Sequence, residues 1–169
     1  MSLTLPAPRS PGRYRIGLVC LGNICRSPVA DVVLTARVAD AGLSDRVEVA
    51  SCGTGPWHVG ESMDRRSAAT LASAGYDPTR HVAQQYDATW PEHYDLLLAM
   101  DEQNLADLGG RGPRTALLRD ADPATPDGVD SAVPDPYYGG PSGFEEVLAM
   151  IEQSCSALVA LLPTALETE

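Results

Sequence analysis

An α/β fold is predicted by two features of the sequence. Apolar segments of strand length alternate with segments of helical periodicity, and clusters of glycine and proline separate them. Strands that alternate with helices form a parallel sheet covered on both faces, and such a sheet binds ligands at the carboxyl ends of its strands. We therefore expect a four-stranded parallel sheet with helices on both faces.

The first half of the chain supplies two of these strands and two helices. Residues 14–19 are a short, largely apolar run that fits a buried strand. A helix is expected over 29–41, where Gly42 ends it. Residues 47–51 alternate like a strand, and residues 63–74 place small and apolar residues at helical spacing. This half therefore predicts the order strand, helix, strand, helix.

The second half repeats the alternation. Residues 96–100 are entirely apolar, as in a buried parallel strand, and Asp101 follows as the N-cap of a helix through about Leu108. A fourth strand is expected over 115–118. The last helix begins with the capping box Ser142-Gly143-Phe144-Glu145 and continues to Leu162, before Pro163. Residues 119–143 are rich in Pro, Asp and Gly and predict a long loop, which is usually functional.

One domain accounts for the whole chain. Its 169 residues, 44% of them hydrophobic, can bury a single substantial core. We expect a loose N-terminal tail over 1–13, a domain over 14–163 and a C-terminal tail over 164–169. The prolines of the first segment interrupt any signal-peptide core, and no apolar run approaches the length of a membrane span.

Charge and cysteine content narrow the class of function. The formal net charge of −11 argues against nucleic acid and anionic membranes as partners. The four cysteines include no C-x-x-C pair, so no tetrathiolate zinc site is expected, nor any metal or cofactor. Without an export signal, they are interpreted as reduced thiols in the cytoplasm. Export by a route without a cleaved signal stays open.

The segment Val19-Cys20-Leu21-Gly22-Asn23-Ile24-Cys25-Arg26-Ser27-Pro28 carries the strongest functional signal. Five residues separate Cys20 from Arg26 between a strand and a helix, and such a loop can curl its backbone N–H groups around an anion. Gly22 and Asn23 tolerate the positive φ of a tight loop. We expect Ser27 at the N-cap and Pro28 at N1 of the helix.

This loop would place a reactive sulfur beside bound phosphate. The backbone dipoles should favour the Cys20 thiolate, which makes Cys20 the candidate nucleophile. Arg26 brings a planar fork that binds two phosphoryl oxygens at once. Ser27 can also donate its hydroxyl to the sulfur when it leaves. Cys25 lies in the same loop and can trap an oxidised Cys20 as a disulfide.

The same segment resembles the phosphate loop of the low-molecular-weight protein tyrosine phosphatases, in their bacterial form. A second motif, Asp135-Pro136-Tyr137-Tyr138-Gly139, resembles the general-acid loop of that family. Both motifs occur in the family's order, and the resemblance covers roughly residues 14–162. The resemblance therefore has the extent of a single average domain.

The resemblance assigns roles to particular residues. It implies Cys20 as nucleophile, Arg26 as phosphate clamp and Asp135 as general acid and base. Its phosphate loop comprises Leu21, Gly22, Asn23, Ile24, Cys25 and Ser27. It implies pocket walls at Trp57, Tyr137 and Tyr138, and supporting residues at His81, which braces the loop through Asn23, and at Ser51. The chain departs from the family at Cys52, at Gln84 and in the segment 119–123, none of which belongs to the catalytic set.

These features predict a metal-free phosphatase that hydrolyses phosphotyrosine and small aryl phosphates through a cysteinyl-phosphate intermediate. Its partners would be phosphotyrosine proteins, and inorganic phosphate as product or inhibitor. Two alternatives stay open. One is a thiol-dependent arsenate reductase of the same fold, which needs a further pair of cysteines. The other is a non-catalytic phosphate-binding or redox-sensing module.

Overall fold

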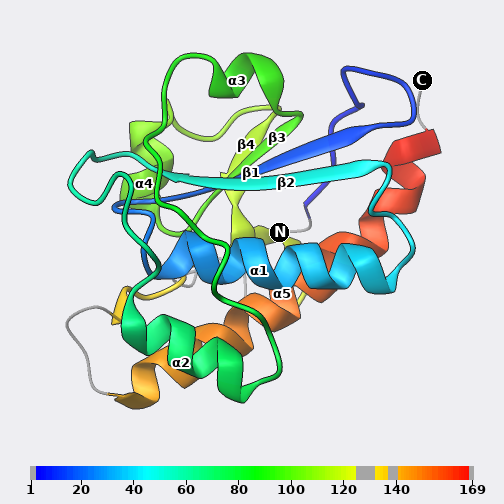
Figure 1. Ribbon diagram of the computed structural model, residues 1–169. Coiled ribbons are helices and arrows are strands. Elements are labelled where there is room, and N and C mark those ends of the chain that lie inside the picture. The colour runs from blue at the N-terminus through cyan, green and yellow to red at the C-terminus, as the bar shows by residue number, and fades with distance from the viewer. Residues whose placement is uncertain (1–2, 125–131, 137–140, 168–169) are drawn as a thin grey trace.

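The central sheet has the predicted architecture. The computed structural model describes residues 3–124, 132–136 and 141–167 (Figure 1). Its strands are β1 (Tyr14–Cys20), β2 (Val47–Gly53), β3 (Leu96–Ala99) and β4 (Thr115–Leu117). All pairings are parallel, in the order β2-β1-β3-β4. The predicted four-stranded parallel sheet is therefore confirmed.

Helices cover both faces of this sheet, as predicted. The helical elements are α1 (Arg26–Asp40), α2 (Arg65–Ser73), α3 (Trp90–His93), α4 (Glu102–Asp107), the 3₁₀ turn η1 (Leu118–Ala121) and α5 (Pro141–Glu167). Figure 1 shows α1, α2 and α5 on one side of the sheet and α3 on the other. The α4 residue Leu105 packs on Ala99, which is in register with Val19 on the α3 side. This arrangement leaves the carboxyl ends of the strands free for loops.

The side chains of β1 alternate between the two faces of the sheet and so contribute to separate parts of the core. Ile16, Leu18 and Cys20 belong to the larger cluster, together with residues of α1 and α5. Val19 points to the other face and packs with Trp90 of α3. Since neighbouring strand residues point to opposite faces, this parity places the Cys20 side chain on the α1 side of the sheet, where α1 begins.

Helix α5 is longer than predicted. We expected it to end before Pro163, but it continues to Glu167 with Pro163 inside it. A proline removes one backbone hydrogen bond from a helix interior, yet Ala165 and Leu166 beyond it are buried in the main cluster. Burial of these two side chains offsets that cost, so tertiary packing overrides the local stop signal.

The N-terminal segment also differs from the loose tail predicted for it. Leu3 and Leu5 pack against the main cluster. The Tyr14 hydroxyl donates to Pro6 O at 2.9 Å, and Arg9 N donates at 2.6 Å to the buried carboxylate of Asp95. Residues 3–13 are thus attached to the domain at several points.

Helix α5 is apolar and long. Among the described residues, Gly143–Glu167 is the one helix with the length and composition of a membrane span, contrary to the expectation that no segment reaches that length. One face of the helix, which includes Phe144, Ile151 and Leu158, is nevertheless buried in the domain. The composition of α5 is therefore that of a core helix.

Candidate active site

The loop between β1 and α1 forms an open ring of backbone donors. Asn23 has a φ of +58°, the only positive φ of a non-glycine residue in the described part of the chain, and it turns the loop as predicted. Across the described residues, the N–H groups of Leu21, Gly22, Ile24 and Cys25 meet no acceptor. The start of α1 lies directly after them, so the loop and the positive end of the helix together suit an anion.

The start of α1 corrects one prediction. The helix begins at Arg26, with Cys25 as an N-cap that makes no side-chain hydrogen bond. Ser27 is therefore inside the first turn, and its predicted N-cap position is wrong. Its hydroxyl lies 2.9 Å from Cys20 Sγ and accepts a hydrogen bond from the Asn23 side chain at 2.9 Å. The Ser27 hydroxyl does not cap the helix because it forms these contacts beneath the loop instead.

The Asn23 side chain determines which groups donate and which accept in this hydrogen-bond network. Gln84 N donates to Asn23 Oδ1 at 2.9 Å, which identifies the other end of the amide as the donor. Asn23 Nδ2 then donates to Ser27 Oγ and, at 3.0 Å, to Ser51 Oγ. Because Asn23 supplies the donor in both bonds, each serine keeps its own hydroxyl hydrogen for another acceptor.

The Ser27 hydroxyl can donate its hydrogen to the Cys20 sulfur. This hydroxyl has two acceptors within reach, Cys20 Sγ at 2.9 Å and Cys52 O at 3.3 Å. Asn23 N also donates to Cys20 Sγ, at 3.3 Å. Two donors therefore face the buried Cys20 sulfur, an arrangement that suits a nucleophile that attacks as thiolate and later leaves as thiolate.

His81 and Gln84 support the loop from outside. His81 Nε2 lies 2.6 Å from Asn23 O; because a carbonyl oxygen only accepts, Nε2 carries the hydrogen. Burial lowers the pKa of His81 below its usual range. Gln84 Nε2 donates to Ser51 O at 2.9 Å. The segment that carries His81 and Gln84 thus fixes the backbone and the side chain of Asn23.

Asp31 extends the network, although no sequence pattern pointed to it. It stands four residues after Ser27, one turn along α1. Its carboxyl interacts with the Ser51 hydroxyl, and Thr35 Oγ1 donates to it at 3.3 Å. Burial raises the pKa of Asp31 to about 6, although Ser51 and Thr35 lower it. A carboxyl with a raised pKa therefore interacts with Ser51, which accepts a hydrogen bond from Asn23 of the phosphate loop.

Replacing Asp31 by asparagine is expected to stabilise the protein at neutral pH. The folded-state pKa of about 6 exceeds the usual 3.8, so the folded protein binds this proton more tightly than the unfolded chain. The ionised carboxyl therefore costs stability above pH 6, by up to about 3 kcal/mol, and the cost disappears as the pH falls below about 4. Urea unfolding of both proteins between pH 4 and 7.5 measures this difference. Asp40→Asn, at an exposed position of α1, is the control; an equal effect at every pH contradicts the assignment.

Arg26 is held in place by two groups that are far from it in the sequence. Its side chain is almost fully buried, and Nη1 donates to Asp101 Oδ2 at 2.7 Å and to Val133 O at 3.1 Å. From the sequence, Asp101 was expected only to cap the helix that follows it. It does so with Oδ1, which accepts a hydrogen bond from Asn104 N at 2.7 Å. The two hydrogen bonds that Arg26 makes with the described residues both use Nη1. The edge formed by Nε and Nη2, where Nη2 also faces Asp135, is therefore the one that can bind a phosphoryl group with two bonds.

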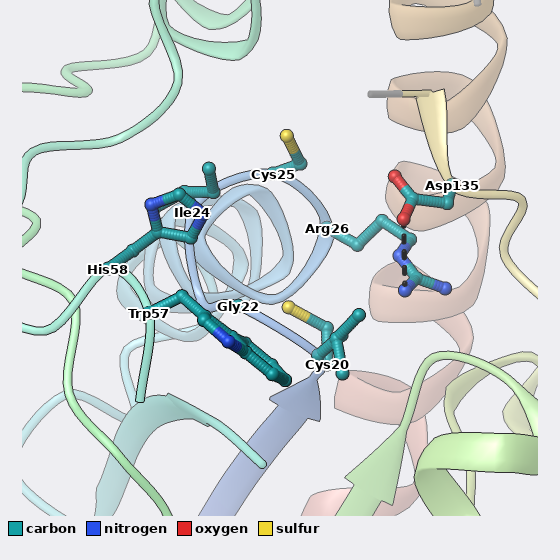
Figure 2. A pocket seen from close by; sticks show the side chains of 9 residues that line it. Cys20, Gly22, Ile24, Cys25, Arg26, Trp57, His58 and Asp135 are labelled. Atoms are coloured by element: carbon teal, nitrogen blue, oxygen red, sulfur yellow. Dashed lines mark ion pairs between the residues drawn. The ribbon is translucent and has the colours of Figure 1, made fainter. Parts of the chain in front are cut away.

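Asp135 reaches the same guanidinium. Its Oδ2 lies 3.7 Å from Arg26 Nη2 (Figure 2), and the Asp135 side chain is 37% exposed. Val133, two residues earlier, is fully buried, and its backbone N donates to Met100 O at 2.6 Å while its carbonyl accepts from Arg26. The buried Val133 thus anchors the segment that brings Asp135 to the phosphate loop.

Two glycines, Gly53 at the end of β2 and Gly55 just after it, permit close packing at the site. A Cβ at Gly53 would lie 2.7 Å from Leu21 O and 2.9 Å from the carbonyl carbon of Gly22. A Cβ at Gly55 would fall within the ring of Trp57. Only glycine lets the phosphate loop rest on the end of β2 and lets the Trp57 ring lie against its own turn.

These elements enclose a pocket of about 380 Å³. It is lined by Cys20, Leu21, Gly22, Ile24, Cys25, Arg26, Trp57, His58 and Asp135. Figure 2 shows the Cys20 sulfur and the Trp57 ring on one side of the pocket and Asp135 beyond Arg26 on the other. His58, for which no role is predicted, also lines the pocket. Tyr137 and Tyr138, the other predicted walls, lie outside the described residues.

The remaining cysteines are free and buried. Figure 2 shows the sulfur of Cys25 pointing away from Cys20, and burial raises the pKa of Cys25 to about 12. Burial also raises the pKa values of Cys52 and Cys155. Cys52 packs with Val19 and Trp90, whereas Cys155 belongs to the cluster on the opposite face. In the described ranges, no group of three or more His, Cys, Asp or Glu side chains could hold a metal ion.

Comparison with known proteins identifies the family. The family model described as low molecular weight phosphotyrosine protein phosphatase matches residues 15–169. The chain belongs to this family. A low molecular weight protein-tyrosine-phosphatase of Streptomyces coelicolor is 48% identical over 153 residues, 87% of this chain and 92% of that protein. The low molecular weight protein-tyrosine phosphatase A of Mycobacterium tuberculosis is 44% identical over 149 residues, 85% and 88% of the two chains.

A solved structure from the same family has the same fold. A protein tyrosine phosphatase of Entamoeba histolytica, with Hepes in its active site, superimposes with a TM-score of 0.82 at 29% identity, covering 89% of this chain and 97% of that one. In this member of the phosphatase family, Cys20, Arg26, Asp135 and Trp57 line a single pocket, and Ser51 and His81 lie behind it.

Proposed function

We propose that this phosphatase hydrolyses phosphotyrosine in proteins, and small aryl phosphates, through a cysteinyl-phosphate intermediate. The observation that carries the proposal is the convergence of Cys20, the free N–H groups of its loop, Arg26 and Asp135 on one pocket. Each of these groups supplies one requirement of phosphoryl transfer: a nucleophile, a cradle for the oxygens, a clamp and a proton donor.

In the first step, the Cys20 thiolate attacks phosphorus and the bond to the tyrosyl oxygen breaks. The loop N–H groups and the Nε–Nη2 edge of Arg26 hold the three equatorial oxygens as charge redistributes in the transition state. Asp135 transfers its proton to the departing phenolic oxygen, so tyrosine leaves as a neutral phenol. Asp135 emerges as a carboxylate.

In the second step, that carboxylate accepts a proton from water as the water oxygen attacks phosphorus. The sulfur–phosphorus bond breaks, and the electron pair returns to Cys20. The Ser27 hydroxyl, 2.9 Å from the sulfur, donates to the departing thiolate. Inorganic phosphate is the product, and because it fits the same cradle we also propose it as an inhibitor.

The pocket favours an aromatic ester. Trp57 presents a flat apolar face beside the sulfur, against which a phenolic ring can stack. Phosphoserine and phosphothreonine carry no ring and would leave this wall uncovered. The preference for phosphotyrosine proteins therefore rests on Trp57, in agreement with the names of the relatives.

The arsenate reductase alternative is less well supported. Electron relay from the Cys20 loop needs two further cysteines that can reach one another. Cys52 and Cys155 pack on opposite faces of the sheet. Asp135 would have no role in such a relay, whereas ester hydrolysis requires it.

A redox lock between Cys20 and Cys25 stays a prediction. The Cys25 sulfur would have to rotate toward Cys20, and its raised pKa lowers the fraction of Cys25 present as the reactive thiolate. The four free cysteines are compatible with the reducing cytoplasm, where we place the protein.

Asp135→Asn tests the proposed acid. Asparagine keeps the size of the side chain but cannot give up a proton, so esters with poor leaving groups should suffer most. We expect kcat for phosphotyrosine to fall about 100- to 1,000-fold, and kcat for 2,4-dinitrophenyl phosphate by less than about tenfold. Steady-state kinetics over a series of aryl phosphates measures this dependence.

Asp45→Asn, an exposed position at the opposite end of the sheet, controls for loss of one negative charge. Equal losses for all leaving groups would remove Asp135 from the acid role. Absence of any hydrolysis by the reduced wild-type protein would instead favour the non-catalytic alternative.

A further inference from the structure

The exposed large apolar side chains of this protein are concentrated in one place. Among the residues that the structure describes, they are Leu21, Trp57, Val59 and Val82, which are 43%, 65%, 56% and 62% exposed. We call these four residues the apolar collar. Single exposed apolar side chains are common on protein surfaces, but a group of them beside a pocket marks a contact site.

Hydrogen bonds hold the segments of the collar together. Gly55 N donates to Leu21 O at 2.9 Å, which attaches the turn carrying Trp57 to the phosphate loop. Val59 N approaches Pro56 O at 3.4 Å, so Trp57 and Val59 belong to the same turn. Leu21 and Trp57 also line the pocket itself. One side of the collar is therefore continuous with the proposed active site.

Val82 is fixed beside this turn from a different part of the chain. Gly60 N donates to Ala83 O at 2.9 Å, and Ala83 N donates to Glu61 O at 2.8 Å. His81, on the other side of Val82, bonds to Asn23 O, and Ala83 is buried. Because both neighbours of Val82 are anchored inward, its side chain is directed outward next to the 59–61 segment.

The collar is built from backbone that the catalytic loop already holds in place. Its apolar surface can therefore bind a partner without first ordering a mobile segment, which limits the entropic cost of binding. Polar side chains would satisfy the local backbone equally well at positions 59 and 82. Their apolar character thus fits a requirement of binding rather than of folding.

We infer that the collar binds apolar side chains next to the phosphotyrosine of a substrate polypeptide. The inference rests on the proposed function, because the phosphotyrosine must occupy the pocket for its neighbours to reach the collar. Val59 is two residues from Trp57, a span of at most about 7 Å, so one or two residues of extended peptide reach it from the ring. The proposed substrate class is thus phosphotyrosine flanked by apolar residues.

The test compares two phosphopeptides that differ only in flanking residues. One carries leucine or valine at the two positions on each side of phosphotyrosine, and the other carries serine there. For the wild-type protein we expect a KM about tenfold lower for the apolar peptide, with similar kcat. In the double variant Val59→Ser/Val82→Ser, the KM for the apolar peptide should rise to that of the serine peptide.

Controls separate binding from damage to the site. Val82→Ile keeps an apolar side chain and should retain the wild-type preference. p-Nitrophenyl phosphate, which has no flanking residues, should have the same KM and kcat with all variants. Equal KM values for both peptides with the wild-type protein would overturn the inference, as would a loss with Val82→Ile equal to that of the serine variant. Either result leaves the proposed function intact, whereas absence of p-nitrophenyl phosphate hydrolysis contradicts that function itself.

Discussion

Replacing Cys20 by serine is expected to abolish hydrolysis while phosphate binding persists. A serine hydroxyl in this loop is a weak nucleophile, and the alkoxide that it would have to release is a far poorer leaving group than a thiolate. We expect kcat for phosphotyrosine to fall by about 10⁴-fold or more. The loop N–H groups and Arg26 do not depend on the sulfur, so calorimetry should still detect binding of inorganic phosphate.

Cys25→Ser is the matched control, because it removes a thiol from the same loop. The Cys25 sulfur is buried and points away from Cys20 (Figure 2), so this variant should retain most of the activity. In the wild-type protein, rapid quenching followed by mass spectrometry should find phosphate on Cys20. A Cys20→Ser protein with more than about 1% of wild-type kcat would exclude Cys20 as the nucleophile.

Replacing Arg26 by lysine is expected to have the second largest effect, although the positive charge is retained. Lysine can keep the ion pair with Asp101, but its single ammonium group cannot present the flat edge of Nε and Nη2 to two phosphoryl oxygens. We expect kcat/KM for phosphotyrosine to fall about 1,000-fold, or about 4 kcal/mol of transition-state stabilisation. Most of the loss should appear in kcat, because the clamp tightens in the transition state.

Arg37→Lys controls for the same chemical change within α1. Arg37 donates to Ser156 Oγ and Glu152 Oε2, away from the pocket, so its replacement should leave the kinetics unchanged. If Arg26→Lys raised KM with kcat unaffected, Arg26 would bind the ground state only and would not act in the chemical step.

The sheet and the loop were predictable because their signals are local. Strand and helix periods are present in short windows of sequence, and the phosphate loop is one uninterrupted segment that ends in Arg26 and Ser27. The tolerance of Asn23 for a left-handed conformation is also a property of that residue alone, and its φ of +58° agrees with the prediction.

The errors arose where a local preference met a stronger distant contact. Ser27 has the residue type of an N-cap, but Cys20 and Asn23 engage its hydroxyl. Pro163 has the residue type of a helix stop, but burial of Ala165 and Leu166 extends the helix past it. In both cases tertiary contacts outweigh a capping or termination preference of about 1–3 kcal/mol.

The sequence by itself determined the fold class, the position of the anion loop and the residue types for nucleophilic phosphoryl transfer. Only the tertiary structure decided which groups orient them. Asp101 and Val133 hold Arg26, Asp31 interacts with Ser51, and Val82 lies beside the segment 59–61. These contacts join segments that meet only when the strands take the order β2-β1-β3-β4 and the helices pack on them. Because short windows of sequence do not encode that packing, local patterns could not reveal them.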